Sequence, residues 1–295
     1  MCGWMGRCAH ALKPLYERMH EKILAGDIAL NDDTPVNVLV PGTGKTRQGR
    51  MWCTVGAEDF KYTMYNFTMS RSREGPSRFF KGYKGYLLTD DYAGYNEVLR
   101  NEEIVHLGCW AHVRRYFKEA QDSQPKAANA VLMLIASLYK IEQKIKNADA
   151  GMRTKVRRKE SRAQLARIFR WLRKNRQDYL PQSPISKAIR HALKIRRTLT
   201  RYSTDGRLPI DNNLAENGIR PIALGRKNWL FLGSETGGQT AAILMSFCAT
   251  CRKLKINTWE YLSDVLQRIN THPISKIDDL LPDRWQELRQ YAASK

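Results

Sequence analysis

Between about residues 27 and 110, the hydrophobic and polar positions follow the pattern of short β-strands. Five stretches are rich in β-branched and aromatic residues, and Gly, Pro, Ser or charged residues separate them. They read "DIALNDDTPVNVLV", "GRMWCTVGA", "KYTMYNFTMS", "GYLLTDDY" and "IVHLGCW". Between the third and the fourth, "GPSRFFKGYKG" predicts a loop or short helix, and "AGYNEVLRNEE" predicts a helix before the fifth. The region therefore predicts five strands.

From about residue 112 the periodicity becomes helical, because apolar residues recur three and four positions apart. Up to about residue 205 this holds for "ANAVLMLIASLYKIEQKI", "AQLARIFRWLRKN" and "ISKAIRHALKIRRTLTRY". Beyond residue 211 it continues in "GGQTAAILMSFCATCRKLKI" and "NTWEYLSDVLQRI". The order of elements predicts an α/β protein whose later part is helical.

Composition adds a class of partner. The 295 residues are 42% hydrophobic, enough for a sizeable core, and 50 Lys and Arg against 29 Asp and Glu give a net charge of +21. Such a charge favours a polyanion, and nucleic acid comes before acidic lipid. The N-terminus lacks the apolar run of a signal peptide, and no apolar stretch is long enough to span a bilayer. The six cysteines are irregularly spaced, which is typical of free thiols in a reducing cytosol. We expect a soluble cytoplasmic protein.

Asp32 is the first candidate for chemistry. Within "IALNDDTPVNVLV" it alternates in phase with apolar residues such as Val36, whereas Asp33 is in phase with polar positions. If the segment is one strand, Asp32 faces the apolar side, where an unpaired carboxylate is costly and needs a cation such as a metal ion. The alternative is that Pro35 breaks the strand and both aspartates lie in a turn.

Two further carboxylate positions are candidates. "YLLTDDY" ends in Asp90 and Asp91, and alternation alone does not choose between them; either could be a solvated strand end. Glu216 falls within the first turns of a predicted helix, where its plain role is to complement the helix dipole. On that helix Asn212, Glu216 and Arg220 are spaced i, i+4, i+8, so a metal ligand would share one face with groups that contact phosphate.

Five segments resemble, in order, motifs of the insertion sequence 66 family of DDE transposases. They are "NDDTPVNVL", "LLTDDYAGYN", "GCWAHVRRYF", "DNNLAENGIRPIALGRKNWLFLGSETGG" and "HPISKIDDLLPDRW". The family's D-E-T-P motif falls on residues 32–35, its T-D-G-Y motif on residues 89–92, and its D-N-N-x-A-E motif ends on Glu216. The resemblance therefore implies Asp32, Asp90 and Glu216 as the catalytic and metal-binding acids. The chain departs from these motifs with Asp33 in place of Glu and Asp91 in place of Gly, and we expect the Asp91 side chain to point away from the metal.

The resemblance also implies a fold and a reaction. The fold is ribonuclease-H-like, a mixed sheet flanked by helices whose three acids bind two Mg²⁺ ions, for which Mn²⁺ can substitute. Such a pair of ions, about 4 Å apart, stabilises both the attacking and the leaving oxygen of a phosphodiester displacement. In the family, hydrolysis exposes a 3′-hydroxyl at the element's end, and that hydroxyl then attacks target DNA. The expected function is DNA cleavage and strand transfer in transposition.

The 125 residues between Asp90 and Glu216 exceed what a compact core needs, which predicts a large all-helical insertion before the helix carrying the third acid. The expected organisation is a helical lead-in at 1–26, the first part of the core at 27–116, the insertion at 117–205, the last part of the core at 206–256 and a C-terminal helical element at 257–295. Residues 140–176 hold 14 Lys or Arg against three acids, which is either a solvated face or a surface that follows DNA phosphates.

Near the third acid, we expect Arg220, Arg226 and Lys227 to contact DNA. Trp229, beside two of these cations, either belongs to the core or stacks on an unpaired base at a transposon end.

Two motifs indicate no further chemistry. Cys109 and His112 have C-x-x-H spacing, but a zinc site needs two more ligands and none is evident nearby, so we interpret them as a structural motif. "GTGKT" at 42–46 lacks the earlier glycine of a phosphate-binding loop and is not followed by a helical pattern, which argues against an ATPase.

Two alternative functions stay open: a ribonuclease-H-like nuclease or resolvase, and a non-catalytic DNA-binding remnant of an element. The expected partners are transposon-end and target DNA, further copies of the chain on DNA, and accessory or full-length transposase proteins, in a bacterial cytoplasm and at the nucleoid when DNA is bound. Family members usually carry a further N-terminal part with DNA-binding and oligomerisation segments. The resemblance thus implies a truncated chain that binds its own element's ends little better than random DNA.

Overall fold

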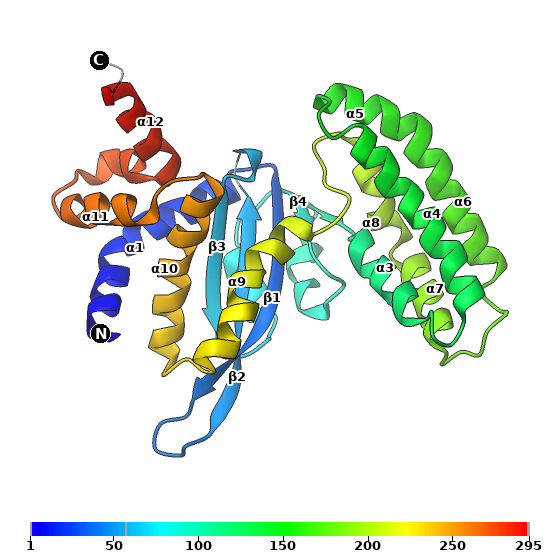
Figure 1. The fold of residues 1–295 in the computed structure, drawn as a ribbon, viewed down its shortest axis with the longest axis horizontal. Helices are drawn as coiled ribbons and strands as arrows, with labels where there is room; N and C mark the ends of the chain where they lie inside the picture. Colours follow the sequence, from blue (N-terminus) through cyan, green and yellow to red (C-terminus); the bar gives the residue numbers. More distant parts are fainter. Residues whose placement is uncertain (1, 57, 294–295) are drawn as a thin grey trace. The chain divides into compact units, whose positions relative to one another are not determined.

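The computed structural model describes residues 2–56 and 58–293, which form two compact units. The first unit comprises residues 1–87, 92–105 and 214–295, and the second comprises residues 88–91 and 106–213. Figure 1 draws the helices of the second unit in green to yellow-green. Both units are discontinuous in sequence, because the chain leaves the first unit and later returns to it.

A five-stranded sheet, mainly in the first unit, has the strand order β3-β2-β1-β4-β5. Its strands are β1 (Ile28–Leu39), β2 (Thr46–Gly56), β3 (Tyr62–Thr68), β4 (Gly85–Leu88) and β5 (Ile104–Leu107). β1 pairs antiparallel with β2 and β2 pairs antiparallel with β3, and Figure 1 shows these three as the long strands of the sheet. The five strands predicted from the hydrophobic pattern are confirmed.

β1 continues through Pro35, so the alternative in which this proline ends the strand is wrong. Pro35 lies opposite Arg50 of β2. On its other side β1 is flanked by β4, which is only four residues long and whose Tyr86 N–H donates to the Asp27 carbonyl at the start of β1. β4 therefore does not extend to Pro35. Because no strand pairs with β1 on that side at Pro35, the missing N–H of the proline removes no hydrogen bond between strands, and a sheet tolerates proline at such a position.

Residues 40–45 form the hairpin turn between β1 and β2, closed by a hydrogen bond from Val40 N–H to the Lys45 carbonyl. The "GTGKT" stretch thus leads into a strand and not into the helix that a phosphate-binding loop requires.

Helices surround the sheet in the first unit. They are α1 (Cys2–Leu24), α2 (Glu74–Phe79), α9 (Asn213–Trp229), α10 (Glu235–Lys253), α11 (Thr258–Arg268) and α12 (Pro282–Ala293), with short turns η1 (Glu58–Phe60), η2 (Ala93–Tyr95), η3 (Val98–Arg100) and η6 (Ile274–Leu280). Leu12 and Met19 of α1, Trp52 of β2 and Phe247 of α10 are fully buried in one apolar cluster. The expected single helix in "AGYNEVLRNEE" is wrong, because this stretch forms the two separate turns η2 and η3.

β3 is the edge strand of the sheet, and α10 satisfies part of its backbone. The Tyr65 N–H donates to Ser246 Oγ at 2.8 Å, while Thr250 Oγ1 accepts from the Thr63 N–H and donates to the Thr63 carbonyl, both at 3.1 Å. These bonds cover the edge at Thr63 and Tyr65, where another strand could otherwise pair.

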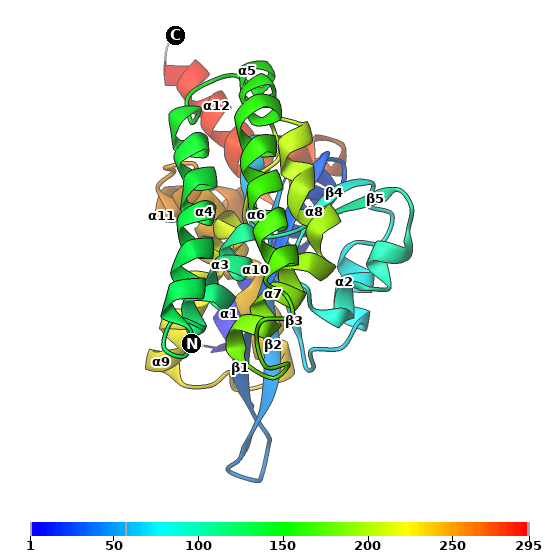
Figure 2. The ribbon, with the colours of Figure 1, turned by 90° about the vertical axis from the view of Figure 1, so that its right-hand side faces the viewer.

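The second unit is helical from residue 110 onward, as the periodicity predicts. Its elements are α3 (Trp110–Glu119), α4 (Pro125–Lys144), α5 (Ala150–Val156), the π-helical turn η4 (Arg157–Ser161), α6 (Arg162–Lys174), α7 (Pro184–Lys194), α8 (Arg196–Arg201) and η5 (Tyr202–Thr204). α4 packs against α3 and α6, and α7 packs against α3 (Figure 2). Trp110, Ile135, Phe169 and Ile189 are buried between these helices.

A fully buried arginine joins the helices of the second unit. The Arg157 guanidinium donates to both carboxylate oxygens of Glu142, at 2.9 and 2.6 Å. Its Nη1 also donates to the carbonyl oxygens of Tyr202, Asp205 and Leu208, at 3.0, 2.8 and 2.9 Å. All three nitrogens of this guanidinium therefore donate hydrogen bonds that hold α4, η4 and the segment after α8 together.

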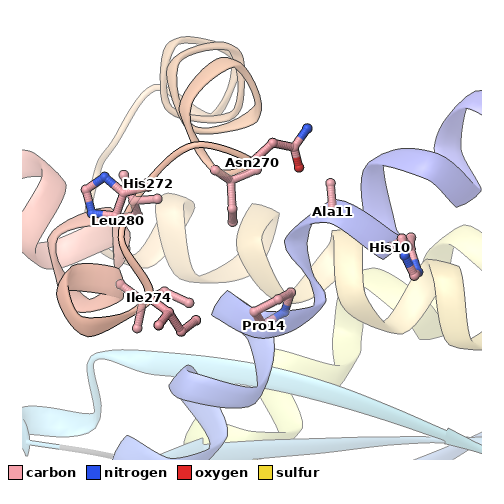
Figure 3. Close-up of a pocket in the computed structure, with 9 residues that line it drawn as sticks. His10, Ala11, Pro14, Asn270, His272, Ile274 and Leu280 are labelled. Atoms are coloured by element: carbon pink, nitrogen blue, oxygen red, sulfur yellow. The ribbon is translucent and has the colours of Figure 1, made fainter.

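A shallow, largely apolar pocket lies between α1 and the segment that leads from α11 into η6 (Figure 3). It is lined by His10, Ala11, Pro14, Ile269, Asn270, His272, Ile274, Ile277 and Leu280. No acid lines it, so it is not a candidate for carboxylate chemistry.

Among the described residues, no helix has both the length and the apolar character needed to cross a membrane.

Candidate active site

Asp32 lies in the interior of β1, on the face of the sheet that α9 covers. Its cross-strand partner is Cys53 of β2, whose own partner on β3 is Tyr65. Partners in a ladder project to the same face, so these three side chains form one row. Burial and the nearby Asp32 carboxylate both raise the pKa of the Cys53 thiol. The strand phase inferred from the sequence, with Asp32 on the same face as Val36, is confirmed.

Glu216 is in the first turn of α9, and the same helix makes a close contact with this row two residues later. A Cβ atom at Gly218 would lie 2.6 Å from Cys53 Sγ, and the Tyr65 hydroxyl donates to the Gly218 carbonyl. α9 therefore meets the sheet at the partner of Asp32, and the first unit brings Asp32 and the turn that carries Glu216 to one face.

Arg226 fixes the other half of α9 to β1. Its Nη1 donates to Thr34 Oγ1 at 2.9 Å and to the Pro35 carbonyl at 2.5 Å. The helix runs through Pro221 without ending. Contacts two turns apart, at Gly218 and Arg226, set both the position and the direction of α9 over β1.

Asp33, next to the proposed ligand, has a structural role. Its side chain is 1% exposed and accepts from Arg50 at 3.1 Å and from Arg71 at 2.7 Å. Arg71 in turn stacks on the ring of Tyr92, with its guanidinium carbon 3.9 Å from the ring centroid. The sequence pattern, which put Asp32 on the apolar face, did not reveal that Asp33 is also buried. The two arginines supply the charge that such burial requires.

Asp90 and Asp91 follow β4 and belong to the second unit, where both line a small cavity with His106 and His191. The Asp91 carboxylate is held by Lys194 Nζ at 2.9 Å, with His191 Nδ1 3.8 Å away. Asp91 thus has a cationic partner of its own, Lys194 on α7. The convergence of Asp90 with Asp32 and Glu216 stays a prediction.

Cys109 and His112 lie at the start of α3. Cys109 Sγ accepts from the Asn212 N–H at 3.2 Å, which joins the start of α3 to the chain just before α9. Burial, followed by the positive charge of Arg115, lowers the pKa of His112 to about 4, so its imidazole is neutral at pH 7. The sulfur contact is of the kind expected for a structural motif.

His106, which the sequence did not single out, also borders the Asp90 cavity. Its Nε2 lies 3.1 Å from Thr89 Oγ1, and burial lowers its pKa to about 4. The only sequence signal was its place near the end of the fifth predicted strand.

The end of α9 exposes an apolar group beside Lys227. Trp229, Leu230 and Phe231 are 36%, 60% and 42% exposed, and Leu230 has a φ of 61° in the left-handed region. The next residue, Leu232, exchanges backbone hydrogen bonds with Asn37 and Leu39 of β1 at 2.8 Å each. These bonds hold the chain that follows α9 against β1. Because Trp229 is 36% exposed, it is not an ordinary core residue. Arg220 and Lys227 are exposed on the same helix.

The contact at Gly218 gives a stability prediction. On helix propensity alone, Gly218→Ala should stabilise α9 by about 1 kcal/mol. The added methyl would overlap Cys53 Sγ, and overpacking of this kind costs about 1–3 kcal/mol, so we expect net destabilisation in chemical unfolding. The double variant Gly218→Ala/Cys53→Ala should recover most of the loss. Additive effects of the two substitutions would contradict the contact.

Two acids of the candidate site offer the kind of ligand that Mg²⁺ or Mn²⁺ takes. Asp32 and Glu216 offer carboxylate oxygens from two rigid elements of one unit, both side chains are partly accessible, and oxygen ligands that leave room for water are what Mg²⁺ prefers.

Comparison with known proteins gives a family. A sequence model described as "Transposase IS66 family" matches residues 1–240, and one described as "IS66 C-terminal element" matches residues 246–282. Three proteins of Sinorhizobium fredii (strain NBRC 101917 / NGR234), named uncharacterized proteins y4qI, y4hP and y4jD, are 33%, 30% and 29% identical to the chain. Each match covers 96% of this chain and 55%, 55% and 58% of the relative, so the chain spans little more than half the length of these relatives. Because the first family model covers well over half of the chain, the chain belongs to the IS66 transposase family.

Proposed function

We propose that the chain is the catalytic part of a DDE transposase, which cuts DNA at the end of an insertion sequence and joins that end to target DNA. Asp32, Asp90 and Glu216 are the proposed metal-binding acids. The observation that carries the proposal is the meeting of α9 with β1: the helix of Glu216 lies over the partner of Asp32 in one compact unit. Membership of the IS66 transposase family supports the reaction.

The proposed fold is ribonuclease-H-like. Support comes from the order β3-β2-β1-β4-β5, with three antiparallel strands followed by two short ones, and from helices around the sheet. In this proposal residues 117–205 are an insertion between β5 and α9, residues 27–116 and 206–256 form the core, and residues 1–26 and 257–295 are helical additions.

When bound, two Mg²⁺ ions would neutralise charge on the attacking and leaving oxygens of the phosphodiester. The carboxylates of Asp32, Asp90 and Glu216 would hold them. Asp33, with Arg50 and Arg71, keeps β1 in position without taking part in the chemistry.

The reaction has two displacements. In the first, a water oxygen attacks phosphorus at the element's end, the bond from phosphorus to the 3′ oxygen breaks, and that oxygen takes a proton to become a 3′-hydroxyl. In the second, this hydroxyl attacks a phosphodiester of the target, displaces another 3′ oxygen and gives up its proton. Arg220 and Lys227, exposed on α9, are suited to contact the phosphates that flank the reacting group.

The direct test of the function is release of 3′-hydroxyl ends from labelled end DNA in the presence of Mg²⁺ or Mn²⁺. We expect DNA cleavage in the presence of the metal ion and no cleavage after the metal is chelated with EDTA. Cutting that persists in EDTA would contradict the proposed chemistry, and cutting without any later joining would favour a nuclease or resolvase.

Trp229 is proposed to stack on an unpaired base at the cut end. Stacking of a base on an aromatic ring contributes about 1–3 kcal/mol, so Trp229→Ala should weaken binding to a duplex with a single-stranded end about 5- to 150-fold. Binding to a blunt duplex should change little. Trp259→Ala is the matched control, because Trp259 is 80% exposed on α11 and has no role in the proposal. Equal effects of Trp229→Ala on both DNAs, measured by fluorescence anisotropy, would refute stacking.

A further inference from the structure

We infer that the outer face of α6, with the groove between α6 and α8, binds the sugar–phosphate backbone of duplex DNA. This inference rests on the proposed function and extends it, because it assigns a DNA-docking surface to α6 and α8 of the second unit.

The first observation is the division of α6 into two faces. Its buried residues are Gln164, Leu165, Ile168, Phe169 and Leu172. Its exposed residues are Arg162, Ala163, Ala166, Arg167, Arg170, Arg173 and Lys174, which at 100° per residue fall within an arc of about 140°. The exposed face of α6 therefore consists of cations and alanines alone.

The second observation is that no acid balances this charge. α6 contains no Asp or Glu, and the five cations of its outer face form no ion pair with any described residue. Two cations elsewhere in the second unit differ, because Arg157 of η4 is bound to Glu142 and Lys144 of α4 is bound to Glu160. A surface that were merely solvated would gain from interspersed acids, whereas a row of unpaired arginines is suited to an anionic partner.

The third observation is the groove beside this row. A cavity of about 220 Å³ between α6 and α8 is lined by Arg162 and Phe169 of α6 and by Arg196 of α8. The Arg196 guanidinium carbon lies 5.4 Å from the Phe169 ring centroid, which orients it. The hydroxyls of Thr200 and Ser203 in the groove already donate to backbone carbonyls, so the two guanidinium groups are the donors available to a phosphate.

The length of α6 suits a short stretch of duplex. From Arg162 to Lys174 the helix rises about 18 Å, which is about the rise of five base pairs along the DNA axis. Arginine can bind each phosphate with two parallel hydrogen bonds.

A membrane surface fits the same charge less well. A basic helix that lies on lipid needs to insert its apolar side between the acyl chains. In α6 that side is buried in the second unit, with Ile168, Phe169 and Leu172 at most 1% exposed.

The test compares two variants of equal charge. The first changes Arg162, Arg167, Arg170, Arg173 and Lys174 to Gln. The second changes five exposed cations of the first unit that also form no ion pair with described residues, Arg7, Lys81, Arg100, Lys255 and Lys276, to Gln. Binding to an arbitrary 30-base-pair duplex is measured between about 50 and 200 mM salt, and circular dichroism checks that both variants fold.

Each phosphate contact contributes about 0.9 to the slope of log K against log salt. We expect the α6 variant to lower this slope by about 3 to 5 and the control to lower it by less than about 1. If the five-fold variant does not fold, Arg170→Gln/Arg173→Gln should lower the slope by about 1 to 2. Equal slopes for the two charge-matched variants would overturn the inference. It would also be overturned if the α6 variant bound duplex DNA like the parent but lost binding to vesicles of anionic lipid. DNA binding is measured without metal and without cleavage, so failure of the proposed catalysis would be seen separately.

Discussion

Asp32→Asn, Asp90→Asn and Glu216→Gln should each lower metal-dependent DNA cleavage by roughly a thousandfold or more, a loss of about 4 kcal/mol of transition-state stabilisation. Each substitution removes one negative charge from the proposed metal site and keeps the shape of the side chain. The fold should persist, and DNA binding without metal should stay within about threefold of the parent, because no cation is lost. Single-turnover cleavage of labelled DNA measures the first effect and anisotropy the second.

Asp91→Asn is the matched control for this series. It makes the same chemical change one residue from Asp90, in a carboxylate that Lys194 and His191 already hold. Cleavage by this variant should stay close to that of the parent. If it falls as far as that of Asp90→Asn, the assignment of Asp90 over Asp91 is wrong; full activity of any of the three acid variants would remove that residue from the site.

Arg157→Met should destabilise the second unit by about 3–5 kcal/mol. The substitution leaves the largely buried Glu142 carboxylate without its main partner and removes one donor from each of three carbonyl groups. Removal of one member of a buried ion pair has a cost of this size. Denaturant unfolding followed by circular dichroism measures the loss, and hydrogen exchange places it in residues 106–213.

Two further variants separate the ion pair from side-chain volume. Arg158→Met changes the neighbouring, exposed arginine and should change stability by less than about 0.5 kcal/mol. Arg157→Met/Glu142→Leu replaces both charges by apolar groups and should recover part of the loss. If Arg157→Met and Arg158→Met were equally stable, the buried network would contribute nothing to the fold.

The sequence predicted the strands because their pattern is local. Apolar and polar residues alternate in β1 both before and after Pro35, and the strand continues through the proline. It can do so because β4 ends before it reaches Pro35, so the missing N–H of the proline interrupts no strand pairing on that side. Asp32 followed from the same alternation. The identity of Asp90 and Glu216 came from the family resemblance, because a carboxylate at a strand end or a helix start has an ordinary structural role as well.

The contacts that the sequence did not reveal join residues far apart in the chain. Asp33 looked like the polar neighbour of a ligand, yet Arg50 and Arg71 bury it, and no local pattern indicates those partners. The close contact between Gly218 of α9 and Cys53 of β2 likewise joins two elements that no local pattern connects. The charge of residues 140–176 was visible, but its division into the paired Arg157 and the unpaired outer face of α6 depends on how the helices pack.

Joining of a pre-cut end tests the central claim most directly. A short duplex with the element's terminal sequence and a free 3′-hydroxyl is incubated with plasmid target, Mg²⁺ or Mn²⁺, and the protein at about 50 mM salt, where phosphate attraction alone supports binding. We predict covalently joined products with the parent and with Asp91→Asn, and none with Asp32→Asn or after chelation of the metal. Joining that survives Asp32→Asn, or plasmid cutting by the parent with no joined product at all, would contradict the assignment of these residues to a strand-transfer site.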